Sequence, residues 1–149
     1  MRIDDEIKMH FRNDYHRVII NLTYSVNQLN YQFLQQVKIH NLTDQQYNIL
    51  MVLITYNSSG PVSIGFIRER MLDKNSDVSR IIDRLVEKEL VSRKENATDR
   101  RQKDLEITEK GVALISEMGY CEKETENLFK YLTLDEVRQL NHLLDKLRG

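Results

Sequence analysis

Cysteine is almost absent from this sequence, since Cys121 is the only one in 149 residues. A single cysteine excludes an intramolecular disulfide framework and the multi-cysteine spacings of zinc and iron–sulfur sites, and it suits a reducing compartment. Proline and glycine are also rare, at one and five residues, which favours long helices with few turns. The motifs of phosphate loops, zinc proteases and serine hydrolases are missing. We therefore expect a helical protein that is not an enzyme and holds neither a metal nor a cofactor.

Long apolar runs are lacking too. The two longest uncharged stretches cover 18–37 and 45–67, but amide side chains interrupt the first and a turn cluster at 57–61 breaks the second. Neither offers the roughly 20 predominantly apolar residues of a membrane span. The acidic start of the chain lacks the basic region of a signal peptide. We expect a cytoplasmic protein without a membrane partner.

Charge of either sign is not in excess, because the formal net charge is −1. Its distribution is uneven, however. Residues 61–110 carry 12 of the 22 lysines and arginines together with 11 of the 23 acids. The function of this segment therefore depends on which face each sign occupies.

Apolar spacing and capping signals predict six helices and one β-hairpin in a single-domain chain. Thr43 with Gln46, and Thr133 with Glu136, match the capping box that begins a helix. The predicted helices run from 4 or 14 to 37, from 43 to the turn at 57–61, and over 63–71, 75–89, 108–132 and 133 onward. The predicted strands cover 90–94 and 103–107, and a polar loop joins them.

A short helix, a tight turn, a second helix and a hairpin in this order are the signature of a winged helix-turn-helix. The expected fold class is therefore mainly α with a small β-hairpin wing (α+β). We place the helix-turn-helix at about 63–88 and the wing at about 90–107, within a DNA-binding lobe of 42–108.

The helix predicted at 75–89 has an apolar face and a polar face. Residues at the start of such a helix meet base edges in the major groove, where serine donates or accepts and arginine pairs bidentately with guanine. The alternative is a solvated helix face with the ion pairs Arg80–Asp83 and Arg84–Glu87. The DNA-binding candidates on this helix are Asn75, Ser76, Ser79, Arg80 and Arg84.

The loop that joins the two predicted strands carries adjacent arginines, Arg100 and Arg101, after Asp99. A polar hairpin tip of this kind reaches phosphates or a narrow minor groove, whose negative potential attracts arginine. Asp99 can orient one guanidinium by a forked pair. The alternative is an ordinary solvated turn.

These features together resemble the multiple antibiotic resistance regulator (MarR) family of winged-helix transcription factors over nearly the whole chain. The resemblance implies a homodimer formed by the N- and C-terminal helices, with recognition helices in two major grooves. It also implies that the serines and arginines named above read or clamp DNA, and that Arg101, supported by Asp99, is the contact at the wing tip. The motifs that carry it are Leu42-Thr43-x-x-Gln46-Tyr47, the run from Asn75 to Leu85, Asp99-x-Arg101 and Leu105-x-Ile107-Thr108-x-x-Gly111.

Two features depart from the family pattern. Glu89 stands just after the recognition helix, where many members have glycine. A left-handed conformation there disfavours a side chain, so we expect this helix to end differently. Lys103 and Asp104 replace residues that are often apolar or basic, which affects how the return strand of the wing contacts DNA.

The terminal helices, in 1–40 and 109–149, carry apolar stripes too long for a small winged-helix core to cover. Pairing two copies across a two-fold axis buries such stripes and matches a two-fold operator. The alternative is intramolecular packing in a monomer. Cys121 falls on an apolar helical face and is expected to be a small buried hydrophobe rather than a redox switch.

The resulting hypothesis is a homodimeric repressor that binds a pseudo-palindromic operator in double-stranded DNA and is released by a small-molecule effector. Two alternatives stay open: a winged-helix module that binds proteins instead of DNA, and an enzyme of unrecognised type. Aromatic candidates for the effector pocket also have core packing as an alternative role. They are Tyr15, Tyr24, Tyr31 and Tyr47.

Overall fold

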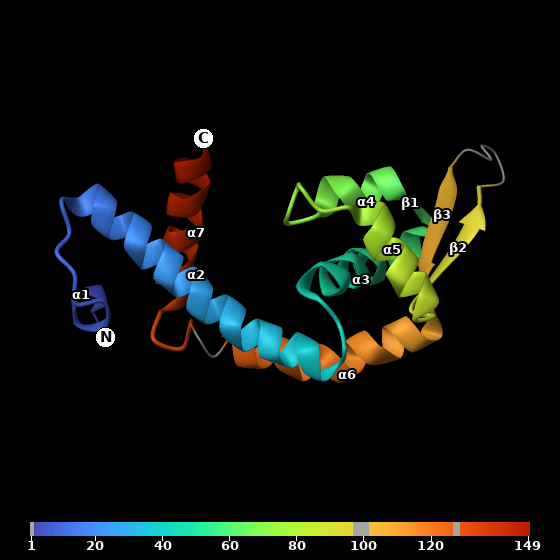
Figure 1. Cartoon of the computed structure of the whole chain (residues 1–149), viewed down its shortest axis with the longest axis horizontal. Helices are drawn as coiled ribbons and strands as arrows, with labels where there is room; N and C mark the ends of the chain where they lie inside the picture. The colour runs from blue at the N-terminus through green and yellow to red at the C-terminus, as the bar shows by residue number, and fades with distance from the viewer. Residues whose placement is uncertain (1, 97–101, 127–128) are drawn as a thin grey trace. The chain divides into compact units, whose positions relative to one another are not determined.

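The computed structural model describes residues 2–96, 102–126 and 129–149, apart from the side chains of 32, 36 and 119–126. The chain divides into two compact units (Figure 1). Unit 1 comprises Met1–Phe33 and Glu124–Gly149, and unit 2 comprises Leu34–Lys123. The predicted division into dimerisation helices and a DNA-binding lobe stays a prediction. None of the helices in the described ranges is long and apolar enough to cross a membrane.

Unit 1 contains α1 (Ile3–Glu6), α7 (Leu134–Arg148) and most of α2 (Asp14–Ile39). The later of the two expected starts of the long helix is confirmed, and the earlier one belongs to the separate helix α1. Asn13 caps the N-terminus of α2, because its side chain accepts a hydrogen bond from the backbone N–H of His16 at 2.9 Å. Polar contacts tie α1 to α2: Arg17 pairs with Asp4, and the hydroxyl of Tyr24 donates to Glu6 at 2.8 Å.

The last helix, α7, has the predicted N-terminus. Thr133 and Glu136 form a capping box in which each side chain accepts from the other's backbone N–H. The hydrogen bond from the backbone N–H of Thr133 lowers the pKa of Glu136 below its usual value. No residue of α7 is fully buried in the single chain. Val137, Leu140 and Leu144 are half-buried, and Leu134, Leu143 and Leu147 are exposed.

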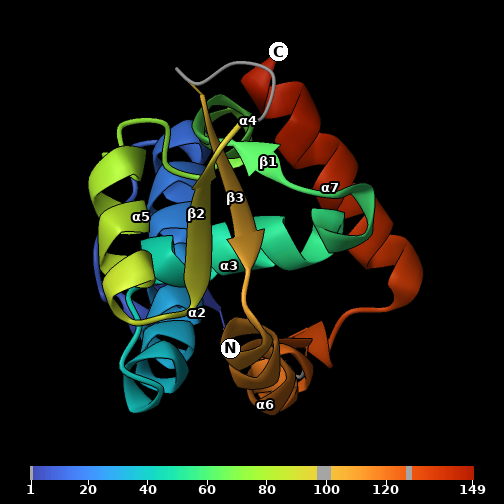
Figure 2. The ribbon, with the colours of Figure 1, turned by 90° about the vertical axis from the view of Figure 1, so that its right-hand side faces the viewer.

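Unit 2 is the winged helix-turn-helix. Figure 2 shows its three-stranded antiparallel sheet with strand order β1-β3-β2, and α5 beside β2. The sheet pairs Val62 with Leu105 and Val91 with Ile107. The sequence did not predict the first strand, because its two residues are too few to produce a strand pattern. In chain order the elements of unit 2 are the C-terminal end of α2, α3 (Asp44–Tyr56), the 3₁₀ turn η1 (Asn57–Ser59), β1 (Val62–Ser63), α4 (Ile64–Arg70), α5 (Val78–Glu87), β2 (Val91–Glu95), β3 (Lys103–Ile107) and most of α6 (Glu109–Glu126).

The apolar faces of these elements meet in one core. Full burial of such a side chain contributes about 1.5–3 kcal/mol, so this core accounts for much of the stability of unit 2. Gly111 brings α6 against it, because a Cβ at this position would lie 2.4 Å from the carbonyl oxygen of Leu90. The core residues that retain no exposed surface include Ile49, Leu50, Ile67, Ile82, Leu85 and Leu105.

The predicted fold class is confirmed, with corrections to two helix boundaries and to the number of strands. The recognition helix begins at Val78 instead of residue 75, because Asp77 caps it by accepting from the backbone N–H of Arg80 at 3.2 Å. The helix that follows the wing ends at Glu126, and residues 129–132 are not α-helical, so the predicted end at 132 is wrong. The wing sheet has three strands instead of two.

Candidate nucleic-acid interface

Side chains from β1 and α3 hold α4 and the turn that follows it. Ser63 caps α4 by accepting from the backbone N–H of Phe66 at 3.1 Å. Asn48 of α3 accepts from the backbone N–H of Leu72 at 2.9 Å. Met71, which follows the last residue of α4 and precedes Leu72, is buried. The two helices of the motif are therefore anchored to α3, and their mutual angle is set by unit 2 itself.

Asp73 organises the approach to the recognition helix. Its carboxylate accepts from the backbone N–H of Asn75 at 2.9 Å, from the hydroxyl of Ser76 at 3.1 Å and from the amide of Gln45 at 3.3 Å. The first two bonds, led by the one from Asn75, lower the pKa of Asp73 from its ordinary value of 3.8. Asn75 and Ser76 thus lie in the turn before α5, not on its outward face as the sequence indicated.

The recognition helix α5 shows the predicted division into two faces. Val78, Ile82 and Leu85 are buried. The opposite face consists of exposed polar side chains, and Ser79 and Arg80 lie in its first turn, where base edges are met. The exposed residues of this face are Ser79, Arg80, Asp83, Arg84 and Glu87.

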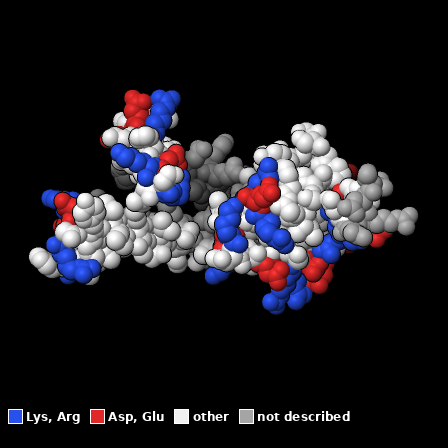
Figure 3. Space-filling model, turned by 90° about the horizontal axis from the view of Figure 1, so that it is seen from above, with Lys and Arg blue, Asp and Glu red and all other residues white. Residues whose placement is uncertain are grey.

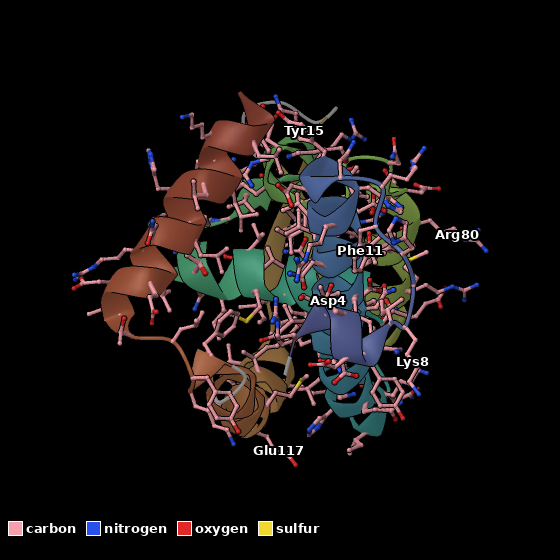
Figure 4. All side chains as sticks on the ribbon, turned by 90° about the vertical axis from the view of Figure 1, so that its left-hand side faces the viewer. Asp4, Lys8, Phe11, Tyr15, Arg80 and Glu117 are labelled. Atoms are coloured by element: carbon pink, nitrogen blue, oxygen red, sulfur yellow. The ribbon has the colours of Figure 1, made fainter. Side chains whose placement is uncertain are left out.

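The ion pairs expected for a merely solvated helix are only half present. Arg84 pairs with Glu87 at 2.8 Å. Asp83, in contrast, pairs with Arg93 of the wing strand β2 and not with Arg80. Within the part of the chain that the structure describes, the guanidinium of Arg80 has no ion-pair partner, and it points outward from α5 in Figure 4. An arginine that is exposed, unpaired and close to a helix start is suited to bind guanine bidentately.

The C-terminal end of α5 is built with a left-handed residue although it is not glycine. Glu89 has φ 61°, a conformation that costs an L-residue roughly 1–2 kcal/mol. Three bonds offset this cost: Thr108 donates to the Glu89 carbonyl at 2.7 Å, and Lys110 contacts the Lys88 carbonyl at 2.9 Å and the Glu89 carboxylate at 3.0 Å. The expectation of a different helix end is therefore wrong for the backbone, and the difference lies in the side chains that hold it.

The base of the wing is a ladder of cross-strand pairs. Lys103 contacts Glu95 at 2.9 Å, and the hydrogen bond that it donates lowers the pKa of that carboxyl. Asp104 accepts from the side chain of Asn96 at 2.9 Å. The two residues that depart from the family pattern thus bind other residues of the wing. Asp99, Arg100 and Arg101, the predicted contacts at the tip, lie outside the described residues.

Sequence reasoning missed Arg93. Its pairing with Asp83 joins the wing to the recognition helix, but ten residues separate the two and only the packing of β2 beside α5 brings them together. The alternation of charge along 83–93 is the one signal that the sequence contains.

The tyrosines proposed for an effector pocket fall in both units. Tyr15 and Tyr31 of α2 are 83% and 67% exposed, so they do not pack into a core of the single chain. Tyr24 is half-buried, and its bond to Glu6 raises the pKa of its phenol. Tyr47 is half-buried on α3. The pocket stays a prediction, and the side chain of Cys121 lies outside the described ones.

Comparisons with known proteins agree with this geometry. The MarR family model matches residues 40–102. The HTH-type transcriptional repressor MdtR of Bacillus subtilis (strain 168) is 34% identical over 99 residues, which span 66% of this chain and 64% of the repressor.

Two solved structures share the fold. One is the S. aureus MepR–DNA complex, with a TM-score of 0.75 and 22% identity over 93% of this chain and 97% of that chain. The other is Bordetella bronchiseptica BpsR, from a study of how 6-hydroxynicotinic acid regulates its DNA binding, with a TM-score of 0.72 and 24% identity over 89% and 99%. Together with the helix-turn-helix and the sheet beside it, these matches identify residues 40–102 as a winged helix-turn-helix of the MarR family of transcriptional regulators.

Proposed function

We propose that this regulator binds a pseudo-palindromic operator as a homodimer and represses transcription from it. The observation that carries the proposal is Arg80. This arginine is exposed and lacks an ion pair among the described residues, and it lies in the first turn of a capped helix whose opposite face is buried in the core. Ser79 beside it offers a hydroxyl to a base or phosphate. The name of the similar B. subtilis protein, a transcriptional repressor, supports the direction of regulation.

The homodimer is supported by apolar side chains that unit 1 leaves uncovered. They occur on both α2 and α7. Spacings of three and four residues place Tyr15, Val18 and Ile19 on one side of α2, and a spacing of four places Leu143 and Leu147 on one side of α7. A two-fold dimer would bury them and present two recognition helices to successive major grooves, which are roughly 34–36 Å apart. The exposed apolar residues of these helices include Tyr15, Val18, Ile19, Val26, Leu134, Leu143 and Leu147.

The wing supplies further contacts in this scheme. Arg100 and Arg101 reach the phosphates or minor groove that flank each half-site, with Asp99 as the orienting carboxylate. The resemblance to the family supports this assignment. In the turn before α5, Asn75 and Ser76 are placed to contact the DNA backbone, while Arg84 serves as a phosphate clamp.

A small-molecule effector would release the operator by favouring a dimer whose recognition helices do not match the spacing of the grooves. The regulation of BpsR by 6-hydroxynicotinic acid supports an effector for this chain as well. Tyr15, Tyr24, Tyr31 and Tyr47 remain the candidate effector residues. A ligand screen by thermal shift, repeated with each tyrosine changed to alanine, tests them.

Selection of bound fragments from genomic DNA tests the proposed function. The expected result is enrichment of a two-fold-symmetric site, with affinity that falls steeply as salt rises because the protein neutralises phosphates. No enrichment of any DNA, or affinity that is independent of salt, would instead favour the protein-binding module. The genes next to the selected sites would also indicate which class of effector to screen.

A further inference from the structure

The DNA-facing side of α5 carries as many acids as cations. Arg80 and Arg84 stand beside Asp83 and Glu87, and all four are exposed. Figure 3 shows the same mixture on a larger scale, since Lys/Arg and Asp/Glu atoms lie next to one another over unit 2. A surface that binds a polyanion gains affinity from each cation and loses it from each acid. The acids on this helix face therefore need an explanation.

Stability does not explain Glu87. It is the last residue of α5, where the helix dipole disfavours a negative charge. Its partner Arg84 lies on its N-terminal side, the less favourable orientation for an ion pair within a helix. Both side chains are largely exposed, at 58% for Arg84 and 61% for Glu87, so water and salt weaken the attraction between them.

The pair does control one cation. Glu87 accepts from Arg84 at 2.8 Å, which holds that guanidinium along the helix surface and neutralises it. A phosphate that binds Arg84 must compete with Glu87 for this guanidinium. Asp83 is different, because it pairs with Arg93 and so links α5 to the wing.

We propose that Glu87 is a specificity-determining residue that restrains Arg84 and thereby suppresses binding to DNA outside the operator. Non-specific complexes obtain nearly all their affinity from phosphate contacts, whereas the operator complex adds base contacts. Competition by Glu87 for Arg84 therefore removes a larger fraction of the affinity from the non-specific complex than from the operator complex. This inference rests on the proposed function, since it requires that α5 faces DNA.

Two carboxylates of equal charge permit a matched test. Glu117, on α6, is exposed and forms no ion pair among the described residues. Figure 4 shows that Glu117 and Arg80 point to different sides. Glu87→Gln and Glu117→Gln therefore change the net charge equally, but only the first releases Arg84. Binding is measured by titration of a mixed-sequence duplex and of the selected operator over a series of salt concentrations.

Glu87→Gln is expected to raise affinity for the mixed-sequence duplex about threefold to tenfold at low salt and to raise operator affinity less. Its log–log salt slope should steepen by about 0.9 for each released Arg84, or about 1.8 for a dimer. Glu117→Gln should match the wild type, and the thermal midpoint of Glu87→Gln should not fall. In an Arg84→Ala background the gain from Glu87→Gln should disappear.

Two results would overturn the inference. One is equal behaviour of Glu87→Gln and Glu117→Gln on the mixed-sequence duplex. Another is a gain that persists in the Arg84→Ala background, since it would reflect net charge alone. If the wild type binds the operator in either case, only this inference fails. If the wild type binds neither duplex at any salt concentration, the proposed function fails with it.

Discussion

The two units of this chain treat their apolar residues in opposite ways. Unit 2 encloses them, so that Ile82 and Leu105 retain no exposed surface. Unit 1 leaves many of its apolar residues open: Leu147 of α7 is 66% exposed, Ile19 of α2 is 59% exposed, and no residue of α7 is fully buried in the single chain. Exposed apolar surface on this scale marks an interaction site. Unit 2 thus encloses a core within the chain, whereas the open apolar surface of unit 1 is what the proposed homodimer would cover.

The ion pairs of unit 2 also differ from those of α7. In unit 2 the described side chains form a network that serves the helix-turn-helix and the wing, from Asp73 in the turn to Asp83 and Arg93. In α7 the ion pairs lie within single helical turns, such as Arg138 with Asp135. Such exposed pairs contribute little to stability. The ion pairs of α7 therefore do not cover its exposed Leu143 and Leu147, which the proposed homodimer would bury.

The largest expected effect is on the core of unit 2. Ile82→Ala should lower the free energy of unfolding by about 2–5 kcal/mol, because it removes a fully buried side chain and leaves a cavity. Val26→Ala, at a 49% exposed position of α2, should cost much less in a dissociated chain. Urea denaturation at several protein concentrations measures both. Equal losses for the two variants would contradict the contrast between the units.

The next largest expected effect is on the dissociation constant of the proposed homodimer. The double variant Leu143→Asp/Leu147→Asp places charges on the open face of α7 and should raise the dimer dissociation constant about a hundredfold or more. His142→Asp is the matched control, because residue 142 lies on a different face of the helix. Sedimentation equilibrium measures the change. A dimer as tight as the wild type would show that α7 does not take part in the interface.

The arginines of unit 2 should differ in what they contribute to DNA binding. Arg80→Ala should cost about 1–3 kcal/mol of operator affinity and relax the preference at one base position of each half-site. Arg101→Ala should weaken binding to all duplexes alike, with a shallower salt dependence. Arg138→Ala on α7 serves as the control. An unchanged consensus with Arg80→Ala would remove its role as a base reader.

The smallest effect is a pH dependence in the turn before α5. The pKa of Asp73 is lowered in the folded chain, so its contribution to stability is present above the unfolded value near 3.8 and is lost as pH falls through the lower folded value. The difference in unfolding free energy between wild type and Asp73→Asn should therefore shrink on acidification below this range. A difference that stays constant with pH would refute the role of the carboxylate.

Local signals in the sequence predicted much of this molecule, and tertiary contacts account for what they missed. Thr43 with Gln46 forms the expected capping box, because every partner lies within one helical turn. The helix predicted to begin at 75 begins at Val78, because the backbone N–H of Asn75 donates to Asp73 and Asp77 caps the helix. The pairing of Asp83 with Arg93 depends on β2 packing beside α5.

Glu89 is a second position where local sequence signals did not predict the tertiary contacts. Its sequence position indicated a helix end without glycine, but not that Lys110 and Thr108 would hold a left-handed backbone there. These partners are about twenty residues away along the chain, beyond the reach of local propensity. The tip of the wing and the effector residues remain predictions.

Guanine-methylation interference with the selected operator tests the central claim most directly, because methylation at N7 blocks arginine in the major groove. The account predicts interference in two major-groove patches separated by one turn of the duplex, about 10–10.5 base pairs, and loss of the signal at one guanine of each patch with Arg80→Ala. A single patch, or a pattern that Arg80→Ala leaves intact, would contradict a two-fold regulator that reads DNA through α5.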